Sequence, residues 1–488
     1  MSSDVICRPG KGKKRAVFPE TVRPAEAGER HRNAEAEAPR TAAEKIQETK
    51  GQIMKKTDER YRAYLNILKR ELVPAFGCTE PIAVAYAAAC LRGLLGGEPE
   101  TLQVEASGNI IKNVKSVIVP NTGGMKGIEA AAAAGIISGR EERQLEVLEE
   151  LTEEDQNAIH RYLERTPVTV SQAPGDLTFD LIVTGERDGH KGKVRIAGAH
   201  TNVVLKELDG KALLKKEIGS CYAPETQSAE AEGPSLTIEG IVDFAVSVEP
   251  EDVKETLERQ ISYNTAISEE GLRGDYGANV GRVLLTTYGD DVKVRARAAA
   301  AAGSDARMNG CELPVVINSG SGNQGLTASL PVIEYAKEMK ADREKLYRAL
   351  VISNLTAVHL KEGIGRLSAY CGAVTAGAGA GAGIAWLLGG GLDEINHTIV
   401  NTLANVSGII CDGAKASCAA KIATSVEAGI LGYYMYKNGQ EFYGGDGIVK
   451  KGVERTIENV ARLGRDGMRE TDREILEIMI GDAGQTGE

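Results

Sequence analysis

The amino-acid sequence predicts an α+β protein with a large, mostly helical domain and an inserted small α/β domain. Helical spacing of apolar residues dominates the start and the second half of the chain. Short β-branched runs separated by turn residues fill the part between about residues 99 and 222. At 488 residues the chain is also too long for one ordinary core, so more than one domain is expected.

The composition narrows the class of partner. The net charge of −11 argues against a general binder of nucleic acid or anionic membranes, so we expect a small-molecule partner. Aromatic residues make up only 4% while glycines number 57, which predicts helices that pack closely through small side chains and a homo-oligomer. The N-terminus lacks the apolar core of a secretory signal, which favours a cytoplasmic protein. The eight cysteines then indicate thiols, metal or catalysis rather than disulfides.

The first elements follow from periodicity. Residues 1–52 are rich in Glu, Arg, Lys, Pro and Ala and are predicted to form a disordered leader. Residues 53–98 are expected to form the first part of the helical domain. "DERYRAYLNILKRELVPAF" has helical spacing and should end as a helix before Pro74. "IAVAYAAACLRGLL" predicts a second helix, with Pro81 in its first turn.

Residues 99–222 are predicted to form the inserted α+β domain. Helices are expected in "GMKGIEAAAAAGIISG" and "EEDQNAIHRYLER", and "SAEAEGPS" is expected to be a linker after the domain. β-branched residues with turn punctuation predict the strands and hairpins, which are expected in "TLQVEAS", "VKSVIVP", "PVTVSQA", "LTFDLIVTGE", "KGKVRIAGAHTNVVLKELDG" and "KALLKKEIG".

Residues 223–488 are predicted to form the rest of the helical domain. Their longest uncharged run, "CGAVTAGAGAGAGIAWLLGGGL" at 371–392, is long enough to suggest a membrane span. It consists largely of Gly and Ala and lacks an aromatic belt, so a tightly packed buried helix is favoured.

The stretch "NVSGIICDGAKASCAAKIATSVEAG", residues 405–429, places Cys411 and Cys418 seven residues apart. On one straight helix the two thiols would lie about 10 Å apart and could not share a zinc ion. Gly408 and Gly413 could break the helix between them, and an iron–sulfur cluster is a larger object that thiolates often hold. Cys371 could supply a third thiolate. From this pattern alone, ordinary buried thiols remain the main alternative.

Several polar loops are candidates for binding an anionic group. "NSGSGNQG" at 318–325 offers backbone N–H groups and small side chains, and "SGNIIKNV", "PNTGG" and "HTN" offer more; for each, a tight turn is the alternative. The first loop lacks the GK[ST] ending of a phosphate-binding P-loop. The candidate substrate-binding residues are Glu80, Asn109, Asn121, Thr122, His200, Asn202, Ser319, Ser321 and Asn323.

Taken in order, "GCTEP", "SGNIIKN", "VPNTGG", "AHTN", "SDARM", "NSGSGNQG" and "CGAVTAG…NVSGIICDGAKASCAAK" resemble the L-cysteine desulfidase family. That family is related to the alpha region of the iron–sulfur L-serine dehydratases. The resemblance spans roughly residues 57–484 and implies a [4Fe–4S]-dependent lyase, without pyridoxal phosphate, that converts L-cysteine to pyruvate, ammonia and sulfide. The open iron of such a cluster acts as a Lewis acid on the substrate carboxylate and leaving group.

The resemblance also implies residue roles. Cys371, Cys411 and Cys418 match the cluster ligands, so residues 223–488 would be a cluster-binding domain, and Cys78 of "GCTEP" matches the proposed proton acceptor. Some related dehydratases carry a C-terminal cysteine that caps the open iron; no cysteine follows Cys418, which favours the desulfidase.

The surrounding residues leave alternatives open. Because Cys78 precedes a predicted helix N-terminus, its pKa is expected to be depressed. Glu80 would orient the substrate ammonium or cap the helix. His200 would contact substrate, serve as an alternative base or only hydrogen-bond its loop. An L-serine dehydratase of the same cluster type and a non-enzymatic iron–sulfur sensor are the alternative functions.

Overall fold

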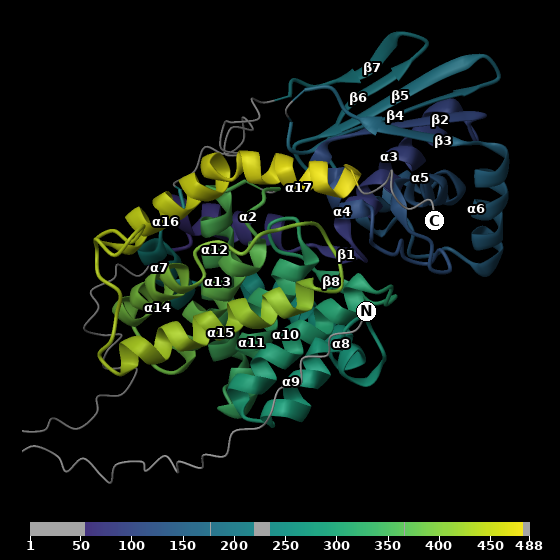
Figure 1. Ribbon diagram of the computed structural model, residues 1–488. Coiled ribbons are helices and arrows are strands. Elements are labelled where there is room, and N and C mark those ends of the chain that lie inside the picture. Colours follow the sequence, from purple (N-terminus) through teal and green to yellow (C-terminus); the bar gives the residue numbers. More distant parts are fainter. Residues whose placement is uncertain (1–53, 176, 219–234, 366, 482–488) are drawn as a thin grey trace, which may run out of the picture. The chain divides into compact units, whose positions relative to one another are not determined.

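The computed structural model describes residues 54–175, 177–218, 235–365 and 367–481, and it confirms the predicted α+β class (Figure 1). The leader predicted at residues 1–52 and nearly all of the predicted linker lie outside the described residues.

Helices make up most of the described part. Between residues 59 and 165 the helices are α2 (Glu59–Glu71), α3 (Thr79–Leu95), α4 (Gly108–Val114), α5 (Gly127–Ser138), η1 (Glu141–Glu146) and α6 (Glu153–Arg165). After the sheet they are α7 (Ile238–Ser247), α8 (Pro250–Arg273), α9 (Val280–Tyr288), α10 (Val292–Met308), α11 (Gly322–Glu338), α12 (Arg343–Glu362), α13 (Gly372–Leu387), α14 (Leu392–Asn405), α15 (Cys418–Lys437), α16 (Val453–Arg462), η3 (Leu463–Gly467) and α17 (Arg469–Gly481).

The described strands form two sheets. A six-stranded sheet has the order β3-β2-β4-β5-β6-β7, in which only the β2–β3 pair is parallel. Its strands are β2 (Thr101–Ala106), β3 (Val168–Gln172), β4 (Asp180–Arg187), β5 (His190–Ala197), β6 (Val203–Leu208) and β7 (Lys211–Lys215). A second, two-stranded sheet pairs β1 (Pro74–Phe76) with β8 (Pro314–Val316) in antiparallel register.

The β1–β8 pair positions the start of α3. The predicted first helix, α2, ends at Glu71, and Pro74 then begins β1 opposite Val316. Two residues after β1, Cys78 is the N-cap of α3. Because β8 leads into the loop before α11, this pairing brings "GCTEP" beside "NSGSGNQG", two segments far apart in the sequence.

One predicted strand is wrong. Residues 114–120, "VKSVIVP", do not form a strand: α4 runs through Val114, and Ile118 makes only an isolated bridge with Lys126. Val114 at the end of α4 and Val117 and Val119 in the segment after it are all fully buried. β-branched residues therefore serve core packing here, and the β propensity of the run is overridden by its tertiary context.

The Gly/Ala run forms a buried helix, as predicted. Helix α13 packs against α11, α12, α14 and α15 (Figure 1). A Cβ atom added at Gly379 would lie 2.4 Å from the Ser353 carbonyl oxygen, and one at Gly377 would lie 2.5 Å from that of Ser425. No helix of the described ranges is long and apolar enough to cross a membrane.

Elements on opposite sides of each predicted domain boundary pack against each other. Helix α3, which lies before residue 99, packs on α5 and on strands β4 and β5. Helix α17, close to the C-terminus, packs on α4 beside the sheet (Figure 1). The boundaries at residues 98 and 222 stay predictions.

Candidate active site

A cavity of about 100 Å³ gathers most of the predicted site residues. The predicted residues that line it are Cys78, Glu80, Asn109, His200, Ser319, Ser321, Asn323, Cys371, Cys411 and Cys418. They come from the start of α3, from α4, from the β5–β6 turn, from the loop before α11 and from the segments before α13 and α15.

Several helix N-termini meet at this cavity. Cys78, Ser321 and Cys371 are the N-cap residues of α3, α11 and α13, and Cys418 is the first residue of α15. The first N–H groups of a helix have no partner within the helix, and the helix dipole places partial positive charge there. The cavity is therefore suited to anionic groups, including thiolates and a carboxylate.

Cys371 and Cys411 are held side by side by backbone hydrogen bonds. The N–H of Cys371 donates to the Ile409 carbonyl at 2.9 Å, and the N–H of Cys411 donates to the Ala369 carbonyl at 2.7 Å. Tyr370 and Ile410 form the isolated antiparallel bridge between these bonds. This short ladder explains how thiols forty residues apart in the chain reach one cavity.

The two thiols also share a side-chain hydrogen bond. That bond lowers the pKa of Cys411 and raises that of Cys371, so a single negative charge of the pair settles on Cys411. The positive charges of Lys112 and Lys361 favour the same outcome. Burial raises the pKa of Cys418.

The segment between Cys411 and Cys418 is a loop, as the two glycines suggested. Helix α14 ends at Asn405 and α15 begins only at Cys418. Gly413 has φ +94°, and a Cβ atom there would lie 2.4 Å from the Lys112 carbonyl oxygen. Asp412 forms ion pairs with Lys415 and Lys421, which close the loop on itself.

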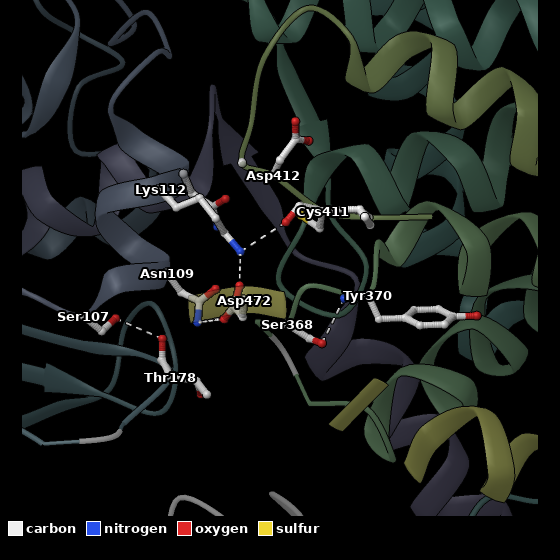
Figure 2. Close-up of polar contacts among 12 residues, drawn as sticks. Ser107, Asn109, Lys112, Thr178, Ser368, Tyr370, Cys411, Asp412 and Asp472 are labelled. Carbon is white, nitrogen blue, oxygen red and sulfur yellow. Dashed lines mark hydrogen bonds and ion pairs between the residues drawn. The ribbon is translucent and has the colours of Figure 1, made fainter. Parts of the chain in front are cut away.

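Lys112 connects this loop to two other elements, as Figure 2 shows. Its side chain, almost fully buried, donates to the Cys411 carbonyl at 3.2 Å and pairs with Asp472 of α17 at 2.5 Å. Asn109 donates to the second oxygen of Asp472 at 2.8 Å. Helices α4 and α17 thus jointly support the Cys411 loop.

At the other end of the cavity, Glu80 organises a buried polar cluster. The Cys78 thiol donates to Glu80 Oε2 at 3.3 Å, and the Asn113 amide donates to Oε1 at 3.3 Å. The Thr79 hydroxyl lies 3.0 Å from both Oε2 and the Gly320 carbonyl oxygen. His200 Nε2 lies 3.7 Å from Oε1, beyond ordinary hydrogen-bond distance.

Charges in this cluster shift two pKa values in opposite directions. Burial opposes ionisation of Glu80, but His200 and Arg307 outweigh it and lower the pKa of Glu80 to about 2. Burial raises the pKa of the Cys78 thiol, the negative charge of Glu80 raises it further, and Arg307 only partly compensates. The expected depressed pKa of Cys78 is therefore wrong, because desolvation exceeds the effect of the helix N-terminus.

Three predicted residues do not line the cavity and instead stabilise turns. Asn121 donates to the Leu148 and Glu149 carbonyls, and Thr122 donates to the Val119 carbonyl at 2.7 Å. Asn202 donates to the Ala197 carbonyl at 2.9 Å.

Sequence reasoning did not select several cavity residues. The largest omission is Arg307, in the middle of "SDARM"; others are Asn113, Gln324, Lys361, Ser368 and Tyr370. The available signal was that Arg307 is the one cation between Ala298 and Met308 of α10, a stretch that is buried and mostly alanine. Because a charged side chain is rarely buried without a partner, a buried arginine such as Arg307 is a candidate functional residue.

Cys371, Cys411 and Cys418 are the residues that could hold an iron–sulfur cluster. Within the described ranges, no three His, Cys, Asp or Glu side chains gather closely enough to hold one metal ion. A cluster binds each thiolate at a different iron, so its ligands lie farther apart than those of one ion. Cys371, Cys411 and Cys418 are free thiols on one cavity, with Lys112 and Lys361 near Cys411 to offset negative charge.

The fold and site define a class: a mainly helical protein with a thiol-lined polar cavity beside a small mixed sheet. Comparison with known proteins identifies the family. The family model for the serine dehydratase alpha chain matches residues 142–477, more than half of the chain. The chain therefore belongs to the serine dehydratase alpha chain family.

Similar proteins cover nearly the full length of the described chain. A UPF0597 protein of Desulfitobacterium hafniense is 58% identical over 427 residues, which is 88% of this chain and 98% of the relative. UPF0597 proteins of Lachnoclostridium phytofermentans and Treponema denticola are 52% and 46% identical, and cover 86% and 87% of this chain and 100% and 99% of their own lengths.

Proposed function

We propose that this protein is an iron–sulfur-dependent β-eliminating lyase that converts L-cysteine to pyruvate, ammonia and sulfide. One observation carries the proposal: a three-thiol end and a Cys78–Glu80–His200–Arg307 end share a single cavity. The serine dehydratase family membership supports the same reaction class, removal of a β-substituent from an amino acid.

Cys371, Cys411 and Cys418 would hold a [4Fe–4S] cluster, which supplies Lewis-acid chemistry through an iron that has no protein ligand. The chain's own residues then bind and orient the substrate. Glu80, ionised because its pKa is about 2, receives the substrate ammonium. Burial remains the main cause of the raised pKa of Cys78, but this pairing offsets the negative charge of Glu80 that raises it further, and so lowers the cost of forming the thiolate.

In the proposed elimination, the Cys78 thiolate accepts the α-proton as the Cβ–S bond breaks and HS⁻ leaves. The resulting aminoacrylate tautomerises to an imine, which water hydrolyses to pyruvate and ammonia. Asn113 and Thr79 hold the Glu80 carboxylate in place during these steps. His200 contacts Glu80 from the other side and keeps it charged.

The test is anaerobic quantification of iron and sulfide together with an assay of sulfide and pyruvate release from L-cysteine. Alanine substitution of Cys371, Cys411 or Cys418 is expected to remove iron and turnover together. Cys78→Ala is expected to keep iron and lose turnover, whereas Cys311→Ala, a buried thiol outside the cavity, should keep both. An iron-free preparation with full activity would refute the proposal.

L-serine is the second candidate substrate, and the serine dehydratase description of the family favours it. Relative kcat/KM on L-cysteine and L-serine decides between the two leaving groups. A protein that binds iron but turns over neither amino acid, with or without Cys78, would instead be a sensor.

A further inference from the structure

We propose that Arg307 binds the carboxylate of an α-amino acid and so makes the cavity selective for amino acids with a free carboxyl group. This inference rests on the proposed function, because it names the residue that determines which class of substrate binds at the same site. The proposal stands on the burial, the partners and the position of the guanidinium.

The Arg307 side chain is buried but poorly satisfied. It is only 4% exposed, and it lines the cavity. Its Nη1 donates to the amide oxygen of Asn323 at 3.2 Å, and its Nε has no hydrogen-bond partner among the described residues. A buried cation held by an amide rather than a carboxylate is costly unless an anion completes its environment.

Other buried polar atoms around the cavity also lack partners. Asn109 Oδ1 and His200 Nε2 are buried and have no hydrogen-bond partner in the described part of the chain. Together with Arg307 Nε they belong to three separate walls of one cavity. Unsatisfied polar groups that share a cavity indicate a polar ligand that the cavity is built to receive.

The backbone leaves room for the guanidinium. A Cβ atom added at Gly322, the first residue of α11, would lie 2.3 Å from Arg307 Nε and 2.7 Å from its Cζ. The guanidinium therefore lies against the N-terminus of α11, whose partial positive charge adds to its own. A carboxylate in the cavity would meet both.

Arg307 and Glu80 line the same cavity and carry opposite charges, as the two ends of an amino-acid zwitterion require. Both charges lie close enough to Cys78 to shift the pKa of its thiol, in opposite directions. A ligand with its carboxylate on Arg307 and its ammonium on Glu80 would lie in the cavity that Cys78 also lines. Arginine suits this role because its planar N–H groups match the two carboxylate oxygens.

Ligands that cannot react separate binding from turnover. L-alanine has no leaving group on Cβ, and L-alaninamide is the same molecule with the carboxylate made neutral. Calorimetric titration of both ligands is done on anaerobic protein, with and without reconstituted iron. The wild type is expected to bind L-alanine about tenfold or more tightly than L-alaninamide in both forms.

Arg307→Met is expected to abolish this preference, and Arg307→Lys to retain part of it. The matched control is Arg297→Met on the same helix, an arginine that pairs with Glu427 at 2.9 Å and does not line the cavity; it should keep the full preference. Thermal melting of each variant without ligand shows that it is folded. If Arg307→Met does not fold, the same comparison of L-alanine and L-alaninamide binding is made with Arg307→Lys.

Three results would overturn the inference. The wild type could bind the two ligands equally, or the preference could survive in the Arg307 variants. The preference could also vanish when iron is removed, which would assign it to the iron. These outcomes are independent of elimination. If Arg307→Met loses the preference for L-alanine and the wild type turns over no amino acid, the inference is supported and the lyase is refuted. If the wild type turns over an amino acid and Arg307→Met keeps the preference, the lyase is supported and the inference is refuted.

Discussion

At the scale of single residues, Glu80 is the most informative side chain of the site. It is 8% exposed, yet it stays ionised because His200 and Arg307 outweigh the cost of burial. Its carboxylate accepts hydrogen bonds from Cys78 and Asn113 and lies 3.0 Å from the Thr79 hydroxyl. The charge of one buried carboxylate therefore links the stability of the fold to the protonation of the proposed base.

The first prediction concerns acid stability. The pKa of Glu80 is about 2 in the folded protein, below its ordinary value of 4.5, so its contribution to stability is complete above pH 4.5. That contribution is lost as the pH falls from about 4.5 to about 2, up to about 3 kcal/mol. Urea unfolding from pH 6 to pH 3 should show a steeper loss of stability for the wild type than for Glu80→Gln.

Glu255→Gln, which changes an exposed carboxylate of α8, is the control and should follow the wild-type pH curve. Equal pH dependence in the wild type and in Glu80→Gln would contradict the first prediction.

At the scale of elements, the loop between α14 and α15 decides where two of the three thiols lie. Its shape depends on the positive φ of Gly413 and on the Asp412 ion pairs with Lys415 and Lys421. Lys112 supports it from α4 and is itself paired with Asp472 of α17 (Figure 2).

The second prediction tests this loop. Gly413→Ala forces a left-handed φ on alanine and brings its Cβ to 2.4 Å from the Lys112 carbonyl oxygen, so the loop must move. We expect less iron per chain after anaerobic reconstitution and a lower melting temperature. Gly408→Ala is the control in the same loop, because its Cβ would meet only the flexible end of Met468 at 3.0 Å. Similar iron content in both variants would argue against the proposed role of the loop.

The third prediction tests the docking of α17. Asp472→Ala leaves the buried Lys112 cation without its partner, which costs about 3 kcal/mol in comparable buried pairs. Amide hydrogen exchange within residues 469–479 should become faster than in the wild type. Glu470→Gln removes an exposed pair with Arg473 on the same helix and should leave exchange unchanged. Unchanged exchange in Asp472→Ala would show that other contacts hold α17.

At the scale of the whole molecule, small residues allow the helical part to pack around α13. The backbones of α12 and α15 approach α13 so closely that several of its glycines have no room for a side chain. This arrangement agrees with the composition, rich in glycine and poor in aromatic residues.

The fourth prediction follows from this close approach. Gly379→Ala places a methyl group 2.4 Å from the Ser353 carbonyl oxygen, and overpacking of this kind costs about 1–3 kcal/mol. The free energy of unfolding in urea should fall by that amount. Gly93→Ala is the control, since this exposed glycine of α3 would meet only the Glu141 side chain at 3.2 Å, and it should be neutral or stabilising. A neutral Gly379→Ala would contradict the prediction.

The sequence was sufficient for the fold class, for most elements and for ten of the residues that line the cavity. Periodicity is a local signal, and the helices and most strands follow it. It was insufficient at residues 114–120, where burial of valines outweighs strand propensity. It also missed Arg307, because a lone cation beside a run of alanines gains meaning only when the fold shows that it is buried and, among the described residues, hydrogen-bonded to the Asn323 amide rather than to a carboxylate.

The pairing of β1 with β8 has a consequence for how the molecule is made. Cys78 is synthesised early, but the strand that positions it begins only at Pro314, and the last support of the Cys411 loop is α17. Synthesis proceeds from the N-terminus, and contacts between distant segments form late in folding. The cavity therefore cannot be complete before β8 and α17 have been translated, long after Cys78. A ligand that needs all of its walls must enter a chain in which these distant segments have already come together.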